Sequence, residues 1–339
     1  MILVTGGTGL VGSHLLYKLV TEKQKVRAFF RRKKTLSRVK HVFSYFSDNA
    51  ETLFNNIEWV EADIADIPKL QSAFQGVSQV YHCAAFVSFE PDKYRTLRKI
   101  NIEGTANIVN LCISKNVKKL CYVSSVAAIG HHNNSDKLID EQTAWNPEDD
   151  NSVYAITKYG AELEVWRGTQ EGLDAVVVNP GVILGPGFWH SGGSGSLFKK
   201  IHKGMSHYTK GVTGYIDVWD VVNCLTNLMD SNIKNEGFIL VSENLSFKAF
   251  QQKVANALGS KPPKKEAKPW LLAIVWRMDW LRYKLLGKRR QLSKQMARSI
   301  TTTTKYDNSK IKNLISYNFK SIDDSIEDVS KLYLNDFEN

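Results

Sequence analysis

Tyr154 and Lys158 stand four residues apart in the stretch SVYAITKYG, residues 152–160. On a helix, that spacing brings both side chains to one face. A phenol beside an ammonium group can give its proton to a carbonyl oxygen, or take one from a hydroxyl group, because the positive charge stabilises the phenolate. A free tyrosine has a pKa of about 10, so it needs such stabilisation to act near neutral pH. The pair therefore predicts proton transfer at a carbonyl or an alcohol.

A second pair with the same spacing, Tyr306 and Lys310, occurs in the stretch YDNSK. The chain has 13 tyrosines and is rich in lysine, so one such match is expected by chance. The surroundings separate the two pairs. Tyr154 follows, after one loop, a strand-like run that ends in Ser124 and Ser125, and a hydroxyl there could orient a carbonyl. Tyr306 has no such surroundings, so we expect the first pair to be the chemical site.

A glycine-rich turn stands near the start of the chain, in VTGGTGLVGSHLL, residues 4–16. Its glycines fall directly between an apolar strand-like run and a segment with helical apolar periodicity. Glycines at this point permit a tight turn and let backbone N–H groups at a helix N-terminus approach a pyrophosphate. The turn therefore predicts a dinucleotide site, with contacts from Thr5, Gly6, Gly9, Leu10, Val11 and Gly12.

The second strand-like run ends in FFRRKK, with Arg31 and Arg32 where an acidic residue would bind the 2′-hydroxyl of an adenosine ribose. Arginine guanidinium groups can bind a 2′-phosphate and stack on adenine. This end favours NADP(H), with NAD(H) as the alternative. Asp63, at the end of the third run, could reach the adenine amine. Capping of the next helix by Asp63 or Asp66 explains the same residues, and both interpretations stay open.

Short β-branched runs alternate with longer amphipathic segments, which is the pattern of a parallel sheet covered by helices. We therefore predict a doubly wound α/β Rossmann fold. The expected strands are 2–5, 25–30, 57–62, 79–84, 118–125, 173–179 and 237–242, and the expected helices are 10–23, 67–75, 93–115 and 152–171.

The alternation fails after Pro180, where a glycine-rich stretch and a tryptophan-rich, basic C-terminal third follow. This change predicts a smaller lobe laid over the edge of the sheet. We assign residues 1–180 to the dinucleotide-binding domain, to which residues 215–242 return. Residues 181–214 and 243–339 are assigned to a C-terminal substrate-binding lobe.

The composition, 43% hydrophobic and 23% charged over 339 residues, predicts an ordered globular protein. The formal net charge is +11, concentrated at 31–40, 261–268 and 287–294, but no nucleic-acid module accompanies these runs, so we expect no nucleic-acid partner. Four cysteines without CxxC spacing predict neither disulfides nor a metal site. The first residues, MILVTGG, read as a strand and not as a secretory leader, so we expect a cytoplasmic protein.

The stretch PWLLAIVWRMDWLRYKLLG, residues 269–287, is apolar and contains three tryptophans between basic runs. Arg277, Asp279 and Arg282 interrupt it, and it lacks the 18 or more uninterrupted apolar residues of a spanning helix. We expect no stable membrane insertion. A helix packed within the lobe is favoured over docking at a membrane interface.

Taken in order, the motifs resemble those of the extended branch of the short-chain dehydrogenase/reductase superfamily, whose members include NAD-dependent epimerases and dehydratases. The similarity spans nearly the whole chain. The matching segments are TGGTGLVG at 5–12, YHCAA at 81–85, NIEGT at 101–105, YVSSVAAIG at 122–130, YAITK at 154–158, NPGVILGPG at 179–187 and YIDVWDVV at 215–222.

The resemblance implies a catalytic set of Ser125, Tyr154 and Lys158, in which Ser125 and not Ser124 binds the substrate oxygen. Asn101 would brace the helix and the water chain behind the lysine. It also implies a homodimer formed through the helices at about 93–115 and 152–171. Further cofactor contacts are expected at Arg31, Arg32, Asp63, Ile64, Ala84, Ala85, Lys158 and Pro180. His82, which has no ligand spacing around it, is expected to be a structural histidine hydrogen-bonded to the backbone and not a base.

Within the superfamily, the segment VVVNPGVILGPG is similar to the corresponding segment of dihydroflavonol-4-reductases and 3β-hydroxysteroid dehydrogenases. The interval from Pro186 to Tyr215 is also short for loops that grip a nucleotide diphosphate. This implies an NADP(H)-dependent oxidoreductase acting on a small carbonyl or alcohol substrate. The aromatic residues Phe188, Trp189 and Tyr208 in the interval from Pro186 to Tyr215 could line the substrate pocket or pack within the lobe.

An NDP-sugar epimerase that recycles a tightly bound NAD(P) is the alternative activity. A dehydratase is disfavoured, because Val126 and Ala127 follow Ser125 where a dehydratase would carry an Asp-Glu pair. A non-catalytic nucleotide sensor is a third alternative, and the presence of the serine, tyrosine and lysine argues against it.

Overall fold

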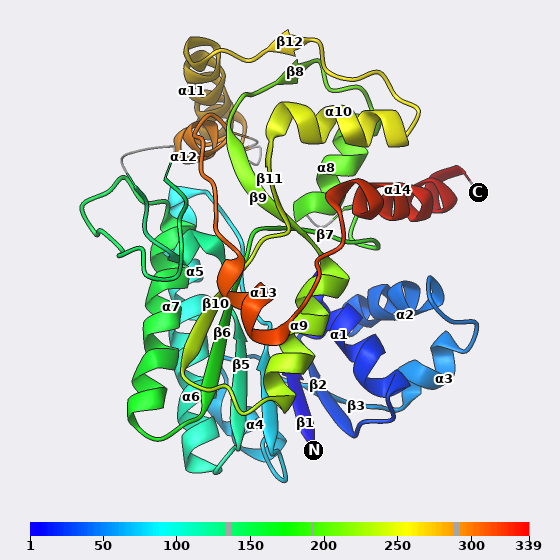
Figure 1. Ribbon diagram of the computed structural model, residues 1–339, viewed down its shortest axis with the longest axis vertical. Helices are drawn as coiled ribbons and strands as arrows, with labels where there is room; N and C mark the ends of the chain where they lie inside the picture. The colour runs from blue at the N-terminus through cyan, green and yellow to red at the C-terminus, as the bar shows by residue number, and fades with distance from the viewer. Residues whose placement is uncertain (133–136, 191–192, 288–289, 291, 339) are drawn as a thin grey trace.

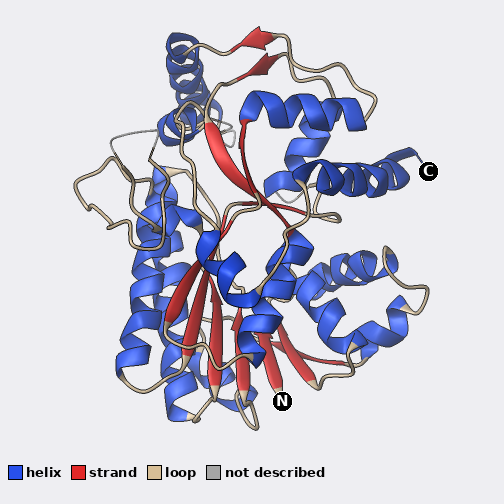
Figure 2. Ribbon diagram, viewed as in Figure 1, coloured by secondary structure: helices blue, strands red, loops and turns tan. Residues whose placement is uncertain are grey.

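The computed structural model describes residues 1–132, 137–190, 193–287, 290 and 292–338. Parts of two stretches singled out in the sequence, the glycine-rich loop at 185–196 and the basic run at 287–294, lie outside the described residues. A large parallel sheet with helices on both faces forms one end of the molecule, and a smaller lobe with its own short strands forms the other (Figures 1 and 2).

The large sheet has seven strands in the order β10-β6-β5-β4-β1-β2-β3, all paired in parallel. The order reverses between β1 and β4, so the sheet is doubly wound, and the predicted fold class is confirmed. Every predicted strand is present, with ends that differ by one or two residues. The strands are β1 Ile2–Thr5, β2 Val26–Phe30, β3 Ile57–Glu61, β4 Gln79–His82, β5 Lys119–Val123, β6 Ala175–Pro180 and β10 Glu236–Leu240.

Two apolar cores lie on opposite faces of this sheet. One face is covered by α1 (Leu10–Thr21), α2 (Leu36–Ser44), α3 (Ala50–Asn55) and α9 (Val218–Asp230). The other is covered by α4 (Ile67–Ala73), α6 (Gly104–Ser114) and α7 (Val153–Gln170). Because strands buried on both faces need apolar side chains on both faces, their sequences are nearly continuous apolar runs.

The helix expected at 93–115 is interrupted in the structure. A short 3-10 turn, Pro91–Lys93, and α5 (Tyr94–Leu97) lead into a π-helical segment, Arg98–Glu103, before α6 begins at Gly104. A Cβ atom at Gly104 would meet Ile64 Cδ1 at 2.6 Å, so only glycine allows the helix to lie this close to the β3 end. Such π segments are wider turns that often occur at functional sites.

The lobe contains a three-stranded sheet in the order β11-β9-β7 and a short parallel pair, β12-β8. Its core includes Tyr215, which stacks on Phe250 with ring centroids 4.6 Å apart. Its elements are β7 Val182–Leu184, α8 Gly193–His202, β8 His207–Tyr208, β9 Val212–Asp217, β11 Glu243–Ser246, α10 Phe247–Ala257, β12 Lys265–Glu266 and α14 Ile322–Glu338.

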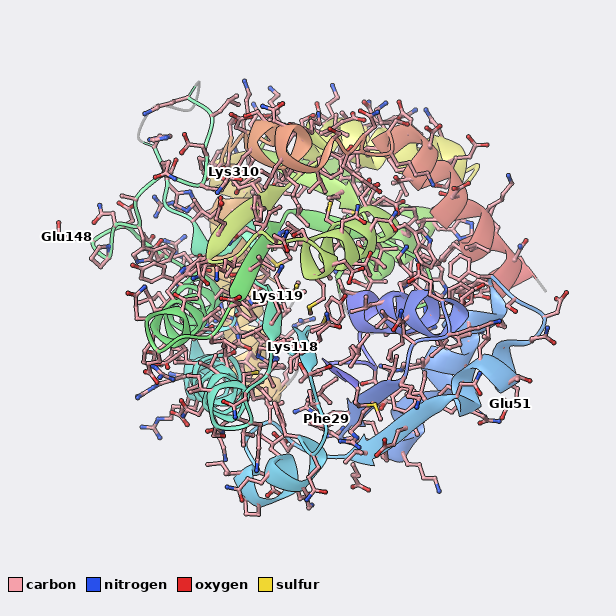
Figure 3. The ribbon with its side chains drawn as sticks, turned by 60° about the horizontal axis from the view of Figure 1, so that its bottom comes forward. Phe29, Glu51, Lys118, Lys119, Glu148 and Lys310 are labelled. Carbon is pink, nitrogen blue, oxygen red and sulfur yellow. The ribbon has the colours of Figure 1, made fainter. Side chains whose placement is uncertain are left out.

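Near its C-terminal end, the chain returns to the large sheet through α13 (Ser309–Ile315). Ile311 is fully buried in the same core as α1 and α9. Lys310, marked in Figure 3, donates to the Gly237 carbonyl at 2.9 Å and pairs with Glu236 at 2.9 Å. Tyr306 precedes α13 and is not on it, so the second tyrosine–lysine pair does not share a helix face.

Two helices, α11 (Pro269–Leu286) and α12 (Lys294–Ser299), stand at an outer corner of the lobe (Figure 1). Of the side chains on α11, only those of Leu272 and Asp279 are buried. As expected, the helix packs into the lobe, through Leu272 and Trp276, which form a small core with Ala267 and Ala297. Most of its other apolar side chains are exposed, which the sequence did not predict. Among the described residues, no helix combines the length and apolar character needed to cross a bilayer.

A buried lysine on β5 ties the sheet to the end of α9. Lys119 Nζ donates to the carbonyls of Leu228 and Ser231 at 2.5 and 2.8 Å. These carbonyls lie at the C-terminal end of α9, where helix carbonyls lack partners of their own and favour a positive charge. Its neighbour Lys118 is exposed, and both are marked in Figure 3.

We expect Lys119→Met to lower the free energy of unfolding by about 1 to 3 kcal/mol, because two carbonyls lose a charged donor. Lys118→Met is the matched control, and a change within about 0.5 kcal/mol is expected for it. Urea denaturation of both variants measures the difference. Equal stability of the two variants would show that the Lys119 contacts add nothing to the fold.

Candidate active site

The glycine loop joins β1 to α1 through a backbone that tolerates no side chains at two positions. Gly6 has φ of +69°, and a Cβ atom there would lie 2.6 Å from the backbone nitrogen of Ala84. A Cβ atom at Gly12 would lie 2.3 Å from Gly6 O. Gly9 occupies the N-cap of α1 and has no side chain to cap it. The first N–H groups of α1 are therefore available to an anion such as a pyrophosphate.

The remaining residues predicted to bind the cofactor lie around this loop at the carboxyl edge of the sheet. Thr5 is fully buried, and its hydroxyl accepts a hydrogen bond from the Ala84 N–H at 3.3 Å, so it holds the ends of β1 and β4 together. Ile64 is buried against α6, and its carbonyl accepts from Asn107 at 3.0 Å. Leu10, Val11 and Ala84 are half-buried, Ala85 is exposed, and Pro180 is buried at the end of β6.

The basic and acidic residues expected near the adenosine end are exposed. Arg31 lies at the end of β2, 3.9 Å from the Asp63 carboxylate, and Arg32 is its exposed neighbour. The helix-capping role belongs to Asp66, which accepts from Lys69 N at the start of α4. Asp63 instead accepts from Ala65 N at 3.0 Å. Both carboxylates border a surface depression lined by Asp63, Ala65, Asp66, Arg95, Thr96, Lys99 and Ile100.

Lys158 lies on α7 and is buried, with 1% of the residue exposed. Its Nζ donates to the Tyr122 hydroxyl at 2.7 Å and to the Val123 carbonyl at 2.9 Å, both on β5. It also lies 4.4 Å from the centre of the Tyr122 ring. Burial lowers the pKa of Lys158 to about 7, with the Glu162 carboxylate acting in the opposite direction. Two of its three donors are thereby used to fix the amine against the sheet.

Tyr154 lies in the first turn of α7, which begins after Ser152 caps it by accepting from Ala155 N at 3.1 Å. Its ring makes an edge contact with Phe89, with centroids 5.4 Å apart. Burial raises the pKa of Tyr154 to about 12, and a hydrogen bond with Ser125 partly offsets the rise. The protein's own groups therefore do not provide the lowered pKa that the neighbouring lysine predicts, because burial outweighs them.

A half-buried carboxylate that we did not predict, Glu162, organises the two serines. It accepts from the Ser124 hydroxyl at 2.7 Å and from Asn179 Nδ2 at 2.9 Å. Asn179 also donates to the Ser125 carbonyl at 3.1 Å. Ser124 is thus engaged away from the tyrosine, whereas the Ser125 side chain caps Ala127 N at 3.2 Å and lies near Tyr154, whose pKa it lowers. Glu162 stands four residues after Lys158, so the same helical spacing that marks the tyrosine and lysine could have revealed it.

Asn101 is held in the π-helical segment by three hydrogen bonds. Its amide oxygen accepts from Phe86 N at 2.8 Å, and its Nδ2 donates to Phe86 O at 3.0 Å and to the Thr157 hydroxyl at 3.2 Å. It is 1% exposed, so it is not the exposed polar residue that a simple surface helix would carry. It clamps the loop after β4 to α7, next to Lys158.

A second unpredicted group of residues connects the lysine to the glycine loop. His82 is fully buried, with Nδ1 2.6 Å from the Thr5 hydroxyl and Nε2 3.0 Å from the Thr105 hydroxyl. Its ring stacks on Tyr122, with centroids 5.4 Å apart. Burial, and then the charge of Lys158, lower the pKa of His82 to about 3, so it is neutral. It is hydrogen-bonded as expected, but through hydroxyl groups.

The arrangement brings a hydroxyl, a phenol and an amine to the carboxyl edge of the sheet, close to the glycine loop. That set can bind a carbonyl oxygen and exchange a proton with it. Trp189 does not contribute, because its Nε1 donates to Asp336 at 2.6 Å and its ring packs against Tyr333. Over the described part of the chain, no three or more His, Cys, Asp or Glu side chains are grouped to hold a metal ion.

Known proteins are similar to this chain in sequence and in fold. A model of the NAD dependent epimerase/dehydratase family matches residues 2–239. Sterol demethylase protein B of Methylococcus capsulatus is 28% identical over 271 residues, which are 80% of this chain and 78% of that protein. A putative dihydroflavonol 4-reductase of Synechocystis is 30% identical over 279 residues, 80% of this chain and 77% of that protein. The crystal structure of gox2253 has the same fold, with a TM-score of 0.82 at 24% identity, covering 99% of this chain and 98% of that one.

The lowered pKa of Lys158 makes a prediction about stability and pH. Between about 7 and the ordinary lysine value of 10.5, the unfolded chain binds a proton that the folded protein does not. Raising the pH through this window therefore favours the folded state, whereas below pH 7 both states are protonated and the cost of burying the charge is constant.

We expect the free energy of unfolding of the wild-type protein, relative to Lys158→Met, to rise from pH 7 toward pH 10.5. The measurement is denaturant unfolding across that range without added cofactor. Lys118→Met, which removes an exposed lysine, should show no such dependence relative to wild type. A flat difference between wild type and Lys158→Met would mean that the buried amine keeps an ordinary pKa.

Proposed function

Because the chain belongs to the NAD dependent epimerase/dehydratase family, in the extended branch of the short-chain dehydrogenase/reductase superfamily, we propose that it is an NADP(H)-dependent oxidoreductase acting on a carbonyl or secondary alcohol. Proteins of this kind are NAD(P)-dependent enzymes, so a nicotinamide cofactor follows from the family. We further propose that the cofactor carries a 2′-phosphate, that the reaction is a hydride transfer to or from the substrate carbon, and that the residues named below perform it.

The observation that carries the proposal is the position of Tyr154 and Lys158 on α7. Tyr154 lies near Ser125, which lowers its pKa, while Lys158, four residues on, is buried and hydrogen-bonded to β5. In the proposed reduction, the Ser125 hydroxyl donates a hydrogen bond to the substrate oxygen. Tyr154 then gives its phenolic proton to that oxygen as the carbonyl becomes an alcohol. With a pKa raised to about 12, Tyr154 carries that proton at neutral pH.

The glycine loop fits the pyrophosphate of a nicotinamide dinucleotide, because glycine backbone and uncapped helix N–H groups face it. Bound NADPH would supply the hydride that adds to the carbonyl carbon. The third donor of Lys158 can bind a ribose hydroxyl, and Asn101 holds the helix that carries this lysine. Arg31 and Arg32 would bind the 2′-phosphate, with Asp63 beside them at the adenine.

For the substrate, we propose an aromatic or alicyclic carbonyl compound. The loop after β4 supports this class, because it places Phe89 against Tyr154. The names of the two similar proteins, a sterol demethylase component and a putative dihydroflavonol reductase, point to ring systems of this kind. An NDP-sugar epimerase is the second candidate, favoured by the family match. The two differ in whether the cofactor is consumed.

We expect Tyr154→Phe to reduce carbonyl reduction at least about 100-fold, because the proton donor is lost. Tyr306→Phe is a matched control, since Tyr306 belongs to the other tyrosine–lysine pair. A panel of ring ketones, aldehydes and NDP-sugars, followed by the absorbance of NADPH, measures the rates. Stoichiometric loss of NADPH identifies a reductase, and sugar turnover without net loss would identify an epimerase. Wild-type rates from Tyr154→Phe would refute the mechanism.

Replacing both arginines, Arg31→Gln with Arg32→Gln, is expected to raise the Kd for NADPH about tenfold or more and to leave the Kd for NADH nearly unchanged. The reason is that only NADPH has a 2′-phosphate for the guanidinium groups to bind. Lys33→Gln with Lys34→Gln is the control for general loss of positive charge. Fluorescence titration measures both constants, and tighter binding of NADH than NADPH by the wild-type protein would exclude the NADP(H) assignment.

A further inference from the structure

The outward side of α11 carries a continuous apolar stripe. It consists of Trp270, Ile274, Met278, Leu281 and Leu285, which recur every three or four residues and therefore line one helix face. Their side chains are 47% to 73% exposed. Val275 and Leu286 extend the exposed apolar surface beside the stripe. Apolar surface on this scale is unusual on a protein that functions alone in water and marks an interaction site.

The inward side of the same helix is fixed to the protein, so the stripe is not a packing face that could turn inward. Asp279 is buried, pairs with Arg282 at 2.6 Å and accepts from Leu292 N at 3.0 Å. Tyr283 donates to Asp92 at 2.9 Å. These polar contacts, together with buried Leu272, hold α11 with its stripe facing solvent.

The charge of the molecule is concentrated around this helix. Residues 261–298 contain twelve lysines and arginines against two acidic residues, a net charge of +10 out of +11 for the whole chain. Both acidic residues are engaged, because Glu266 pairs with Lys210 at 2.8 Å and Asp279 pairs with Arg282. The segment therefore presents a positive field to a partner.

Aromatic and basic side chains meet beside the stripe. The Arg277 guanidinium lies 4.5 Å from the Trp276 ring centre, and the Lys284 ammonium lies 4.8 Å from that of Trp280. Long cationic side chains beside an apolar face can keep their charge at the level of lipid headgroups, and tryptophan prefers the same interfacial zone. This combination is typical of helices that lie in the plane of a membrane surface.

We propose that α11 docks this protein on an anionic lipid membrane, with the apolar stripe buried among the headgroups and upper acyl chains. The alternative to lipid is a second copy of the chain that covers the stripe in a dimer. Pairing two copies through α11 would bring two segments of +10 charge together, whereas an anionic surface attracts them. Each basic residue near such a surface adds to the attraction.

Docking would also place the proposed active site near the membrane. Tyr283 holds α11 to Asp92, in the loop region that includes Phe89, the neighbour of Tyr154. Arg298, just after α11 in the lobe, pairs with Asp150, two residues before the cap of α7. A carbonyl substrate dissolved in lipid would then have a short path to the site. This consequence rests on the proposed function, whereas the docking itself does not.

The test is sedimentation of the full-length protein with vesicles of phosphatidylcholine mixed with phosphatidylglycerol, and with vesicles of phosphatidylcholine alone. We expect the protein to pellet with the anionic vesicles, to pellet much less with the neutral ones, and to be released by added salt. A protein that stays in the supernatant with anionic vesicles at low salt would overturn the proposal, whatever its enzymatic activity.

The triple variant Ile274→Gln, Met278→Gln and Leu285→Gln removes the centre of the stripe and should weaken binding to anionic vesicles about tenfold or more. Ile67→Gln with Leu314→Gln, at exposed apolar positions elsewhere, should bind like wild type. Melting temperatures of both variants confirm that they fold. Binding of the triple variant to anionic vesicles as tightly as the wild type would overturn the proposal. So would the finding that the wild type is a dimer and the triple variant a monomer.

Discussion

The burial of the Lys158 ammonium against β5 is the constraint on which the rest of the site depends. A charged amine out of water must be paired, and here the Tyr122 hydroxyl and Val123 carbonyl pair it. Those bonds fix the rotation of α7 relative to the sheet. Tyr154 and Glu162, one helical turn away on either side, are therefore turned toward the two serines at the end of β5. One buried contact thus sets the positions of all the proposed catalytic groups.

The same lysine is joined to the nucleotide-binding end through side chains of three strands and one helix. Tyr122 stacks on His82, which lies between the hydroxyls of Thr5 and Thr105. Thr5 in turn accepts from Ala84, directly beside the glycine loop. Because each of these groups is buried and hydrogen-bonded, a shift at the loop carries a cost at the lysine. The glycine loop and the lysine of the proposed proton-transfer site therefore belong to one connected polar network at the carboxyl edge of the sheet.

The lobe adds an exposed surface, on α11, that is apolar and basic, unlike the buried polar network of the site. The sheet half buries most of its apolar residues in two cores, whereas α11 exposes a stripe of apolar side chains inside a strongly basic segment. Tyr283 and Arg298 connect that segment to the loops beside Tyr154. The surface proposed to bind lipid is thus joined to the loops beside the site proposed to bind ring carbonyls. This arrangement is consistent with a substrate that is poorly soluble in water.

The sequence by itself determined the order of the elements, the glycine turn and the tyrosine–lysine pair, because these depend on periodicity and spacing over a few residues. The doubly wound α/β class followed from that order. Only the tertiary structure revealed Tyr122, Thr105 and Glu162, since each acts across a gap between a strand and a helix that are distant in the chain. The π-helical turn around Asn101 also depends on such a contact, the approach of Gly104 to Ile64. Only the tertiary structure showed that α11 exposes its apolar stripe. The sequence pattern of an apolar helix is the same whether the helix packs on the protein's own core or on an external partner.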